Sequence, residues 1–263
     1  MNPGLRSSAS GMLAQQKRID AIANNLANVN TPGFKRSRVT FEDMLYETLQ
    51  GTGIVNYQNT ETVQPMQLGR GVRLATIQRV HTKGSAETTN GQFDLMIDGA
   101  GFFQVQRPDG SMAYTRDGSF RPSDTGTLVN HSGYTVMPQI TIPADTTGVA
   151  ISPDGYVSIT VEGSSEVVEL GQIQLTRFIN PSGLEALGEN LYAQTPASGE
   201  PIEGYAQENG FGRVLQGYLE ASNVEIVQEM VDMIAAQRAY EVNSRAIRTA
   251  DEMIERAVNG LIR

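Results

Sequence analysis

The stretch SNVEIVQEMVDMIAAQRAYEVNSRAIRTADEMIERAVNGL, residues 222–261, decides the fold of this chain. Its apolar residues return at alternating steps of four and three, the a/d pattern of a helix that packs along a narrow seam. Eight of the eleven seam positions are apolar. The seam positions are Ile226, Met230, Met233, Gln237, Tyr240, Ser244, Ile247, Asp251, Ile254, Val258 and Leu261.

The predicted helix runs from Val224 to Asn259. Ser222 or Asn223 can cap its first turn, and Glu225 follows Ser222 at the spacing of a capping box. At a rise of 1.5 Å per residue the helix is about 54 Å long. This length suits a rod or stalk.

The N-terminal end carries the same pattern over residues 5–29. Pro3 suits the first turn of a helix, and the NTPG cluster at 30–33 ends the helix after Val29. Six of its seven seam positions are apolar, and the exception is Gln16. The seam positions are Leu5, Ala9, Met12, Gln16, Ile19, Ala23 and Leu26. Two such open-ended helices predict pairing with each other or with a second copy of the chain.

The middle of the chain has the pattern of short antiparallel strands. Alternating runs lie on both sides of the turn sequences PDG (108–110), RDG (116–118) and PDG (153–155). The predicted fold class is therefore α+β, with terminal helices paired as a coiled coil and a central antiparallel β domain. The predicted domains are the N-terminal helix 1–30, an extended linker 31–71 with an insertion at 50–71, a β domain 72–221 and the C-terminal helix 222–263.

Composition excludes several classes of function. The 263 residues include no cysteine, which excludes disulfides, thiolate metal sites and thiol catalysis. The net charge is −9, and residues 41–221 hold nine basic against twenty-one acidic residues, which argues against nucleic-acid binding. Residues 1–40 hold six basic residues against Asp20 alone. Residues 222–263 hold five arginines against seven acidic residues. A basic N-terminal helix beside an acidic C-terminal helix favours their pairing, although solvated charged faces would give the same pattern.

No membrane span or cleavable signal is expected. A span needs about 20 consecutive apolar residues, which this chain lacks. A secretory signal needs an apolar run of about 7–15 residues, and charged residues interrupt the first twenty.

No catalytic, cofactor or metal site is predicted. His81 and His131 have no neighbours at metal-ligand spacing, so we expect both to be exposed. The DGAG sequence at 98–101 is similar to the opening of a dinucleotide loop, but Gln104 replaces the third glycine and a strand pattern follows. Asp94, Asp98, Asp109 and Asp117 mostly stand beside turn glycines or prolines, where aspartate bonds locally.

Several motifs resemble one protein family. NNLANVNTPGFK at 24–35 closely resembles the signature of the bacterial flagellar axial proteins, the rod and hook family. LEASNVEIVQEMVDMIAAQRAYEVNSRAIRTADEMI at 219–254 is similar to that family's C-terminal helix. IDGAGFFQV (97–105), AYTRDGSF (113–120) and GENLY (188–192) are similar to its internal motifs, so the resemblance covers essentially the whole chain.

The resemblance implies a structural subunit of a helical tube. The terminal helices would form an inner coiled-coil layer around an export channel, and the β domain would form the outer wall. The insertion at 50–71 is similar to the insertion that rod members of the family carry, whereas hook proteins usually lack such an insertion. Implied partners are other copies of the chain, proximal rod proteins, the hook protein, the surrounding P and L ring proteins and the flagellar type III export apparatus, which needs no cleaved signal peptide.

Under this interpretation the helices and the insertion carry assembly. Polar residues in an apolar seam can fix register and partner number. Asparagine prefers caps and turns to helix interiors, and we expect the amides of Asn24, Asn25, Asn28 and Asn30 to bond with the backbone or side chains of adjacent subunits. The remaining candidate assembly residues are Leu5, Met12, Ile19, Leu26, Phe34, Ile226, Met230, Met233, Gln237, Tyr240, Asn243, Ile247 and Ile254; those of the insertion are Gly51, Gly53, Tyr57, Pro65 and Leu68.

Two other classes of function remain open at this point. A β domain on a coiled-coil stalk also describes a binding module, which would form a defined small oligomer instead of an open polymer. A wall hydrolase would need a convergent acid pair, and no such pair can be singled out from the sequence.

Overall fold

The computed structural model describes residues 3–50, 66–161 and 167–261. The chain divides into two compact units. The helical unit comprises Met1–Leu26, Ser37–Gln78 and Glu225–Arg263, and the β unit comprises Ala27–Arg36 and Arg79–Val224.

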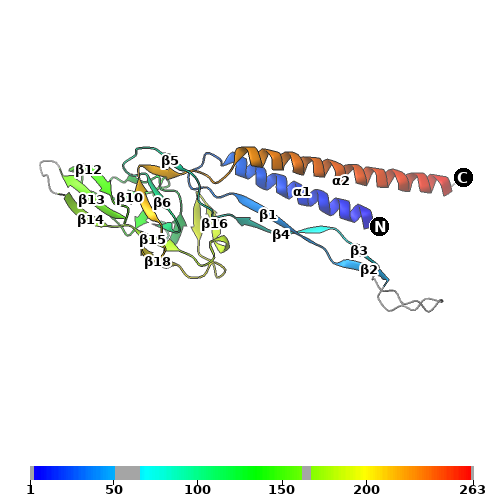
Figure 1. Cartoon of the computed structure of the whole chain (residues 1–263), viewed down its shortest axis with the longest axis horizontal. Coiled ribbons are helices and arrows are strands. Elements are labelled where there is room, and N and C mark those ends of the chain that lie inside the picture. Colours follow the sequence, from blue (N-terminus) through cyan, green and yellow to red (C-terminus); the bar gives the residue numbers. More distant parts are fainter. Residues whose placement is uncertain (1–2, 51–65, 162–166, 262–263) are drawn as a thin grey trace. The chain divides into compact units, whose positions relative to one another are not determined.

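Two α-helices lie side by side in the helical unit (Figure 1). They are α1 (Pro3–Ala27) and α2 (Ile226–Leu261), and they run antiparallel. α1 ends two residues before the predicted end at Val29, while α2 has the predicted length of 36 residues. No helix in the described part of the chain is long and apolar enough to cross a membrane.

The predicted cap of α2 is wrong. Ser222 Oγ accepts the Val224 N–H at 3.3 Å, one residue short of a contact with Glu225. The Asn223 side chain accepts the Arg36 N–H at 2.8 Å and donates to the Val80 carbonyl at 2.7 Å. Asn223 therefore ties segments of the β unit together instead of capping the helix.

A β ribbon completes the helical unit (Figure 1). Its strands are β1 (Ser37–Asp43), β2 (Tyr46–Gln50), β3 (Met66–Gly69) and β4 (Val72–Arg79). β1 pairs with β4, and β2 pairs antiparallel with β3. The ribbon is attached to α1, because Ser10 Oγ accepts the Val72 N–H at 3.2 Å and Asn25 bonds with the backbone of Ser37.

The largest sheet described in the β unit has nine strands. Seven follow the order β16-β17-β8-β7-β11-β10-β9, and β15 joins β7 to β18. Their bounds are β7 (Phe102–Gln106), β8 (Met112–Thr115), β9 (Arg121–Pro122), β10 (Leu128–Val129), β11 (Thr135–Met137), β15 (Gln174–Arg177), β16 (Glu185–Gly188), β17 (Leu191–Ala193) and β18 (Ile202–Tyr205).

Three smaller sheets and one short helix complete the β unit. The order β12-β13-β14 forms a three-stranded sheet, and β19 pairs with β6 and β20 with β5. Their bounds are β5 (Ala86–Thr88), β6 (Leu95–Asp98), β12 (Thr146–Ile151), β13 (Tyr156–Val161), β14 (Val167–Gln172), β19 (Arg213–Gln216) and β20 (Tyr218–Glu220), and the 3₁₀ helix η1 covers Pro181–Gly183. These strand pairings are antiparallel, which confirms the α+β class.

The core of the β unit is built on β7. Successive residues of a strand point to opposite faces. Phe103 accordingly packs in the larger apolar cluster, with the Phe120 ring centroid at 5.1 Å, and Phe102 packs in a smaller one with Tyr114, Phe178, Leu184 and Tyr192. Both faces of this strand are buried, which fixes its place in the sheet.

Candidate assembly site

The face between α1 and α2 is narrow and partly polar. Arg18 pairs with Asp232 at 2.8 Å, and Asn25 Nδ2 donates to Glu229 at 3.2 Å. A Cβ added at Gly11 would lie 3.0 Å from the amide nitrogen of Asn243. These contacts hold the two helices close together inside one chain.

As a description of this face, the predicted seam is wrong by one residue. In most turns the residue one position before the seam residue is covered as well as, or instead of, the seam residue, which shifts the face by up to about 100°. Leu5 and Ile247 are exceptions, because they are covered and the residues before them are exposed. The covered residues one position before the seam are Ser8, Gly11, Gln15, Arg18, Ile22 and Asn25 in α1, and Glu229, Asp232, Ala236, Ala239, Asn243 and Ala250 in α2. Many of them are small, and small side chains allow a close approach of helix axes.

Most of the predicted seam residues lie beside this face instead of in it. Leu5, Met12, Ile19, Leu26, Met233 and Ile247 are half-buried, whereas Ala9, Gln16, Ala23, Ile226, Met230, Gln237, Tyr240 and Ile254 are exposed. Asn243, a candidate assembly residue outside the seam, lies in the face between the helices, next to Gly11. Their part in packing between subunits stays a prediction.

The rotation leaves a row of aliphatic side chains on α2 open to solvent. This apolar stripe consists of Ile226, Val227, Met230, Val231 and Ile234, which are between 46% and 71% exposed. Contiguous exposed apolar side chains are uncommon on monomeric proteins and mark interaction surfaces. The stripe is the strongest sign of a binding surface in the helical unit.

The asparagines that we expected to bond with adjacent subunits have different environments. Asn25 is buried, and its amide bonds both the N–H and the carbonyl of Ser37, at 2.8 and 2.9 Å, besides Glu229. Its hydrogen bonds therefore lie inside the chain. Asn28 accepts the Thr31 hydroxyl at 3.2 Å, and Asn24 is exposed.

Phe34 and the insertion complete the set of predicted residues. Phe34 is buried in the β unit, with the Arg79 guanidinium 5.8 Å from its ring centroid. Leu68 lies in β3 and is 40% exposed. The other predicted residues of the insertion, Gly51, Gly53, Tyr57 and Pro65, lie outside the described residues.

A buried ion cluster joins both ends of the β unit, and sequence reasoning missed it. Lys35 Nζ contacts Glu220 Oε1 at 2.5 Å and the Thr82 carbonyl at 2.8 Å. Arg116 approaches Glu220 Oε2 at 3.4 Å and donates to the carbonyl of Gly99 at 2.7 Å. The only signal in the sequence is that all three charges lie within the motifs NTPGFK, YTRDGSF and LEASN.

Burial governs the charges of this cluster. Lys35 and Glu220 are shielded completely from solvent, and Arg116 nearly so. Burial lowers the pKa of Lys35, while the attraction of Glu220 raises it. A buried charge needs a partner, so Lys35 and Glu220 depend on each other.

The expectation for His131 is confirmed, and that for His81 is wrong. His131 is exposed in a turn. The His81 ring is largely buried, with ring centroids of Tyr192 at 5.3 Å and Phe102 at 5.6 Å. Burial, and then the charges of Lys35 and the neighbouring arginines, lower the pKa of His81 to about 4, so this imidazole is neutral near pH 7.

Most of the aspartates for which the sequence predicts local hydrogen bonds do make such bonds. Asp109 accepts the Ser111 N–H at 2.9 Å, and Asp117 accepts the Ser119 N–H at 3.0 Å, as expected for turns. Asp98 pairs instead with Lys83 and Arg213. The DGAG turn at 98–101 leads into β7, a strand, so it lacks the helix of a dinucleotide loop.

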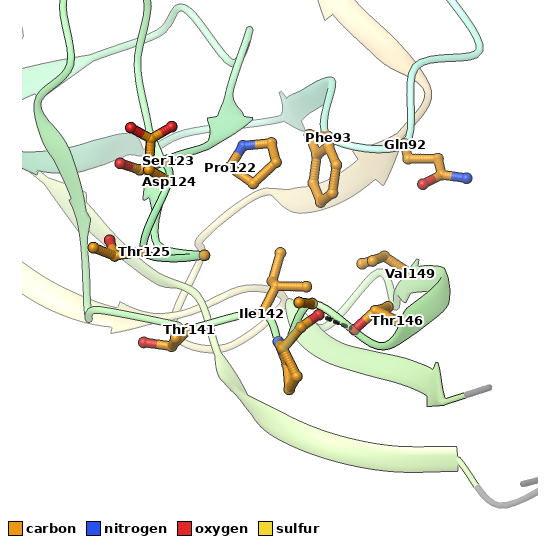
Figure 2. A pocket seen from close by; sticks show the side chains of 13 residues that line it. Gln92, Phe93, Pro122, Ser123, Asp124, Thr125, Thr141, Ile142, Thr146 and Val149 are labelled. Atoms are coloured by element: carbon orange, nitrogen blue, oxygen red, sulfur yellow. Dashed lines mark hydrogen bonds between the residues drawn. The ribbon is translucent and has the colours of Figure 1, made fainter. Parts of the chain in front are cut away.

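One pocket of about 480 Å³ opens between β-unit loops (Figure 2). Phe93, Pro122 and Ile142 form its apolar part, and the Thr146 hydroxyl donates to the Pro143 carbonyl at 2.7 Å. Asp124 is the only titratable residue among the described lining residues. This lining offers no acid–base pair, and no group of three metal-ligating side chains occurs in the described part of the chain.

Comparison with known families agrees with a chain whose terminal helices precede and follow a β-rich segment in the sequence. Residues 5–35 match the family described as flagella basal body rod protein. Residues 96–159 match the flagellar hook protein FlgE/F/G D1 domain, and residues 215–260 match the flagellar basal body rod FlgEFG protein C-terminal family. The matches define the class: an axial protein of the bacterial flagellum.

Full-length relatives identify the family within this class. The flagellar basal-body rod protein FlgG of Buchnera aphidicola subsp. Acyrthosiphon pisum is 49% identical, covering 97% of this chain and 98% of the relative. In Caulobacter vibrioides, FlgG is 44% identical (95% and 96% covered), whereas FlgF is 33% identical (99% and 98% covered). The chain belongs to the family of flagellar basal-body rod proteins FlgG.

Proposed function

We propose that this chain is a structural subunit of the flagellar distal rod. It polymerises helically into a straight, hollow drive shaft that transmits torque from the motor to the hook and encloses the export channel. The observation that carries the proposal is the exposed apolar stripe of α2 in a member of the FlgG family. An identical stripe on every copy gives every copy the same reason to associate.

In this proposal α1 and α2 form the inner layer of the shaft. Each antiparallel pair of helices packs its uncovered apolar side chains against neighbouring pairs, in coiled-coil fashion. Residues 1–30 and 222–263 form this layer, residues 31–71 connect it outward with the rod-type insertion, and residues 72–221 form the outer wall. Burial of apolar surface stabilises the shaft by about 25 cal/mol per Å².

The proposed partners follow from a place in the middle of the axis. The subunit contacts other copies of itself, proximal rod proteins on one side and the hook protein on the other. The P and L ring proteins surround its outer wall, and the rod crosses the periplasm. The chain reaches this place through the type III export apparatus without a cleaved signal peptide.

Two members of the wider family are the alternatives. A proximal rod protein is less favoured, because the Caulobacter FlgF is less similar to this chain than the FlgG of the same organism. A hook subunit is less favoured because full-length relatives that are 49% and 47% identical to this chain are rod proteins. We propose a structural role without catalysis, in line with the rod-protein names of these relatives.

Polar substitutions in the apolar stripe test the proposal. Val227→Ser and Ile234→Ser lie on exposed positions, so folding of the single chain should be unchanged within about 0.5 kcal/mol. Sedimentation should show loss of polymer with both variants. Val167→Ser, at a valine 66% exposed in β14, is the matched control and should assemble more nearly like the wild type. Equal assembly by all variants would contradict the proposal.

A further inference from the structure

A second pocket in the β unit, of about 430 Å³, is lined by positively charged side chains. We call it the basic pocket. Its lining residues include Lys83, Arg116, Arg177 and His81, and none of them is acidic. The complete lining is His81, Lys83, Gly99, Ala100, Gly101, Phe102, Arg116, Arg177, Phe178, Ile179 and Pro181.

Two of the three cations at the basic pocket have acidic partners, and the third does not. Lys83 pairs with Asp98, and Arg116 pairs with Glu220. Arg177 stacks on the Phe211 ring at 5.6 Å, and among the described residues no carboxylate forms an ion pair with it. Its positive charge is therefore available to an incoming anion.

The groups behind the pocket add positive potential. Lys35 and Arg116 share the single carboxylate of Glu220, which leaves one buried positive charge in excess. His81 lies beside them, and its Nδ1 atom is buried without a hydrogen-bond partner in the described structure. A concave site lined by charges of one sign attracts ions of the opposite sign more strongly than a flat surface does.

The rest of the β unit has the opposite charge. Residues 27–36 and 79–224 together hold nine basic and seventeen acidic residues. Four of those nine, Lys35, Lys83, Arg116 and Arg177, lie at or directly behind the basic pocket. The remaining surface of the same unit is therefore electrostatically complementary to the pocket.

We infer that the basic pocket takes an aspartate or glutamate side chain from the acidic surface of a second copy of this chain. The inference rests on the proposed function, since it concerns contacts within the polymer. Such a contact joins unlike patches, and head-to-tail contacts of this kind build open helical assemblies. Ile179, 82% exposed at the pocket, offers an apolar contact beside the carboxylate.

Neutral substitution of one arginine tests the inference in the full chain. Arg177→Gln should raise the critical concentration for polymerisation about tenfold, because a charge-assisted hydrogen bond is lost. Arg121→Gln removes the same charge from an exposed position outside the basic pocket, and it should change the critical concentration for polymerisation less than about twofold. Added salt should weaken assembly of the wild type more than that of Arg177→Gln.

A crosslink provides a readout that does not depend on the stability of the arginine variant. A photoreactive phenylalanine at position 179 in the otherwise unchanged chain should crosslink to an acidic segment of another copy. Crosslinks confined to apolar segments, or equal effects of Arg177→Gln and Arg121→Gln, would overturn this inference and leave the proposed function standing. A wild type that does not polymerise would overturn both.

Discussion

Lys35 and Glu220 form an ion pair in which neither side chain reaches solvent, although the two residues stand 185 positions apart. Lys35 follows α1, and Glu220 ends β20 shortly before α2. The pair therefore closes the β unit at the place where the chain enters and leaves it. Arg116 and the Gly84 N–H, 2.9 Å from Glu220 Oε1, complete the carboxylate's contacts.

Removing one partner of this pair should destabilise the β unit strongly. Lys35→Met removes the nearest partner of the buried Glu220 carboxylate, because Arg116 lies farther away at 3.4 Å, and should cost about 3 kcal/mol of unfolding free energy. Lys17→Met is the matched control, because Lys17 forms an exposed pair with Asp20, worth about 0.5 kcal/mol or less. Urea unfolding measures both, and equal losses would contradict the structural role of Lys35.

The neutral, buried His81 should make stability depend on pH. Its pKa is about 4 in the folded chain and about 6.5 in the unfolded chain. Between these values the unfolded chain binds a proton that the folded chain does not. Stability is therefore fully present above pH 6.5 and decreases as the pH falls towards 4, by about 3 kcal/mol in total.

Thermal unfolding of the wild type and His81→Gln between pH 4 and 7 measures this contribution. The difference between their stabilities should change with pH, because glutamine does not titrate. His131→Gln, at an exposed histidine, should follow the wild-type curve. Parallel curves for the wild type and His81→Gln would mean that His81 is protonated normally in the folded chain.

Asn25 and Asn24 should separate folding from assembly. Asn25→Ala removes three hydrogen bonds inside the helical unit and should lower the unfolding free energy by about 1–3 kcal/mol. Asn24 is exposed, so Asn24→Ala should destabilise the single chain less than Asn25→Ala does, and it should weaken assembly. Unfolding of the monomer and sedimentation of the polymer distinguish the two effects. Equal loss of folding in both variants would refute the assignment of Asn24 to assembly.

Gly33 should tolerate no side chain. Its φ is +69°, and an added Cβ would lie 2.6 Å from the Asp117 backbone nitrogen. Gly110 also has a positive φ, +83°, but nothing lies within 4 Å of its added Cβ. Gly110→Ala should therefore cost about 1 kcal/mol from backbone strain alone, and Gly33→Ala clearly more. Similar losses in urea unfolding would show that the loop moves away freely.

The sequence predicts the elements of this fold well because their signals are local. The four-and-three periodicity indicates both helices, and the turns at Asp109 and Asp117 form through bonds to residues two positions away. The phase of the helix face was not predictable in the same way. On each helix a row of small residues and a row of larger apolar residues lie next to each other and repeat with the same period. Which of the two rows is buried depends on how the other helix packs, and the periodicity of one helix does not show this.

The buried ion cluster and His81 depend on distant residues, so no local pattern reveals them. Glu220 lies 104 positions from Arg116, and each charged residue alone has the pattern of a solvated surface residue. His81 is buried by Phe102 and Tyr192, which come from different strands. Their roles become visible only when the sheet brings these residues together.

Electron microscopy of the purified full-length protein tests the central claim most directly. At concentrations above the assembly threshold, we expect straight, hollow tubes of uniform diameter, built by repetition of one subunit contact. Monodisperse small oligomers that persist at high concentration would contradict it, because a closed oligomer cannot form a drive shaft.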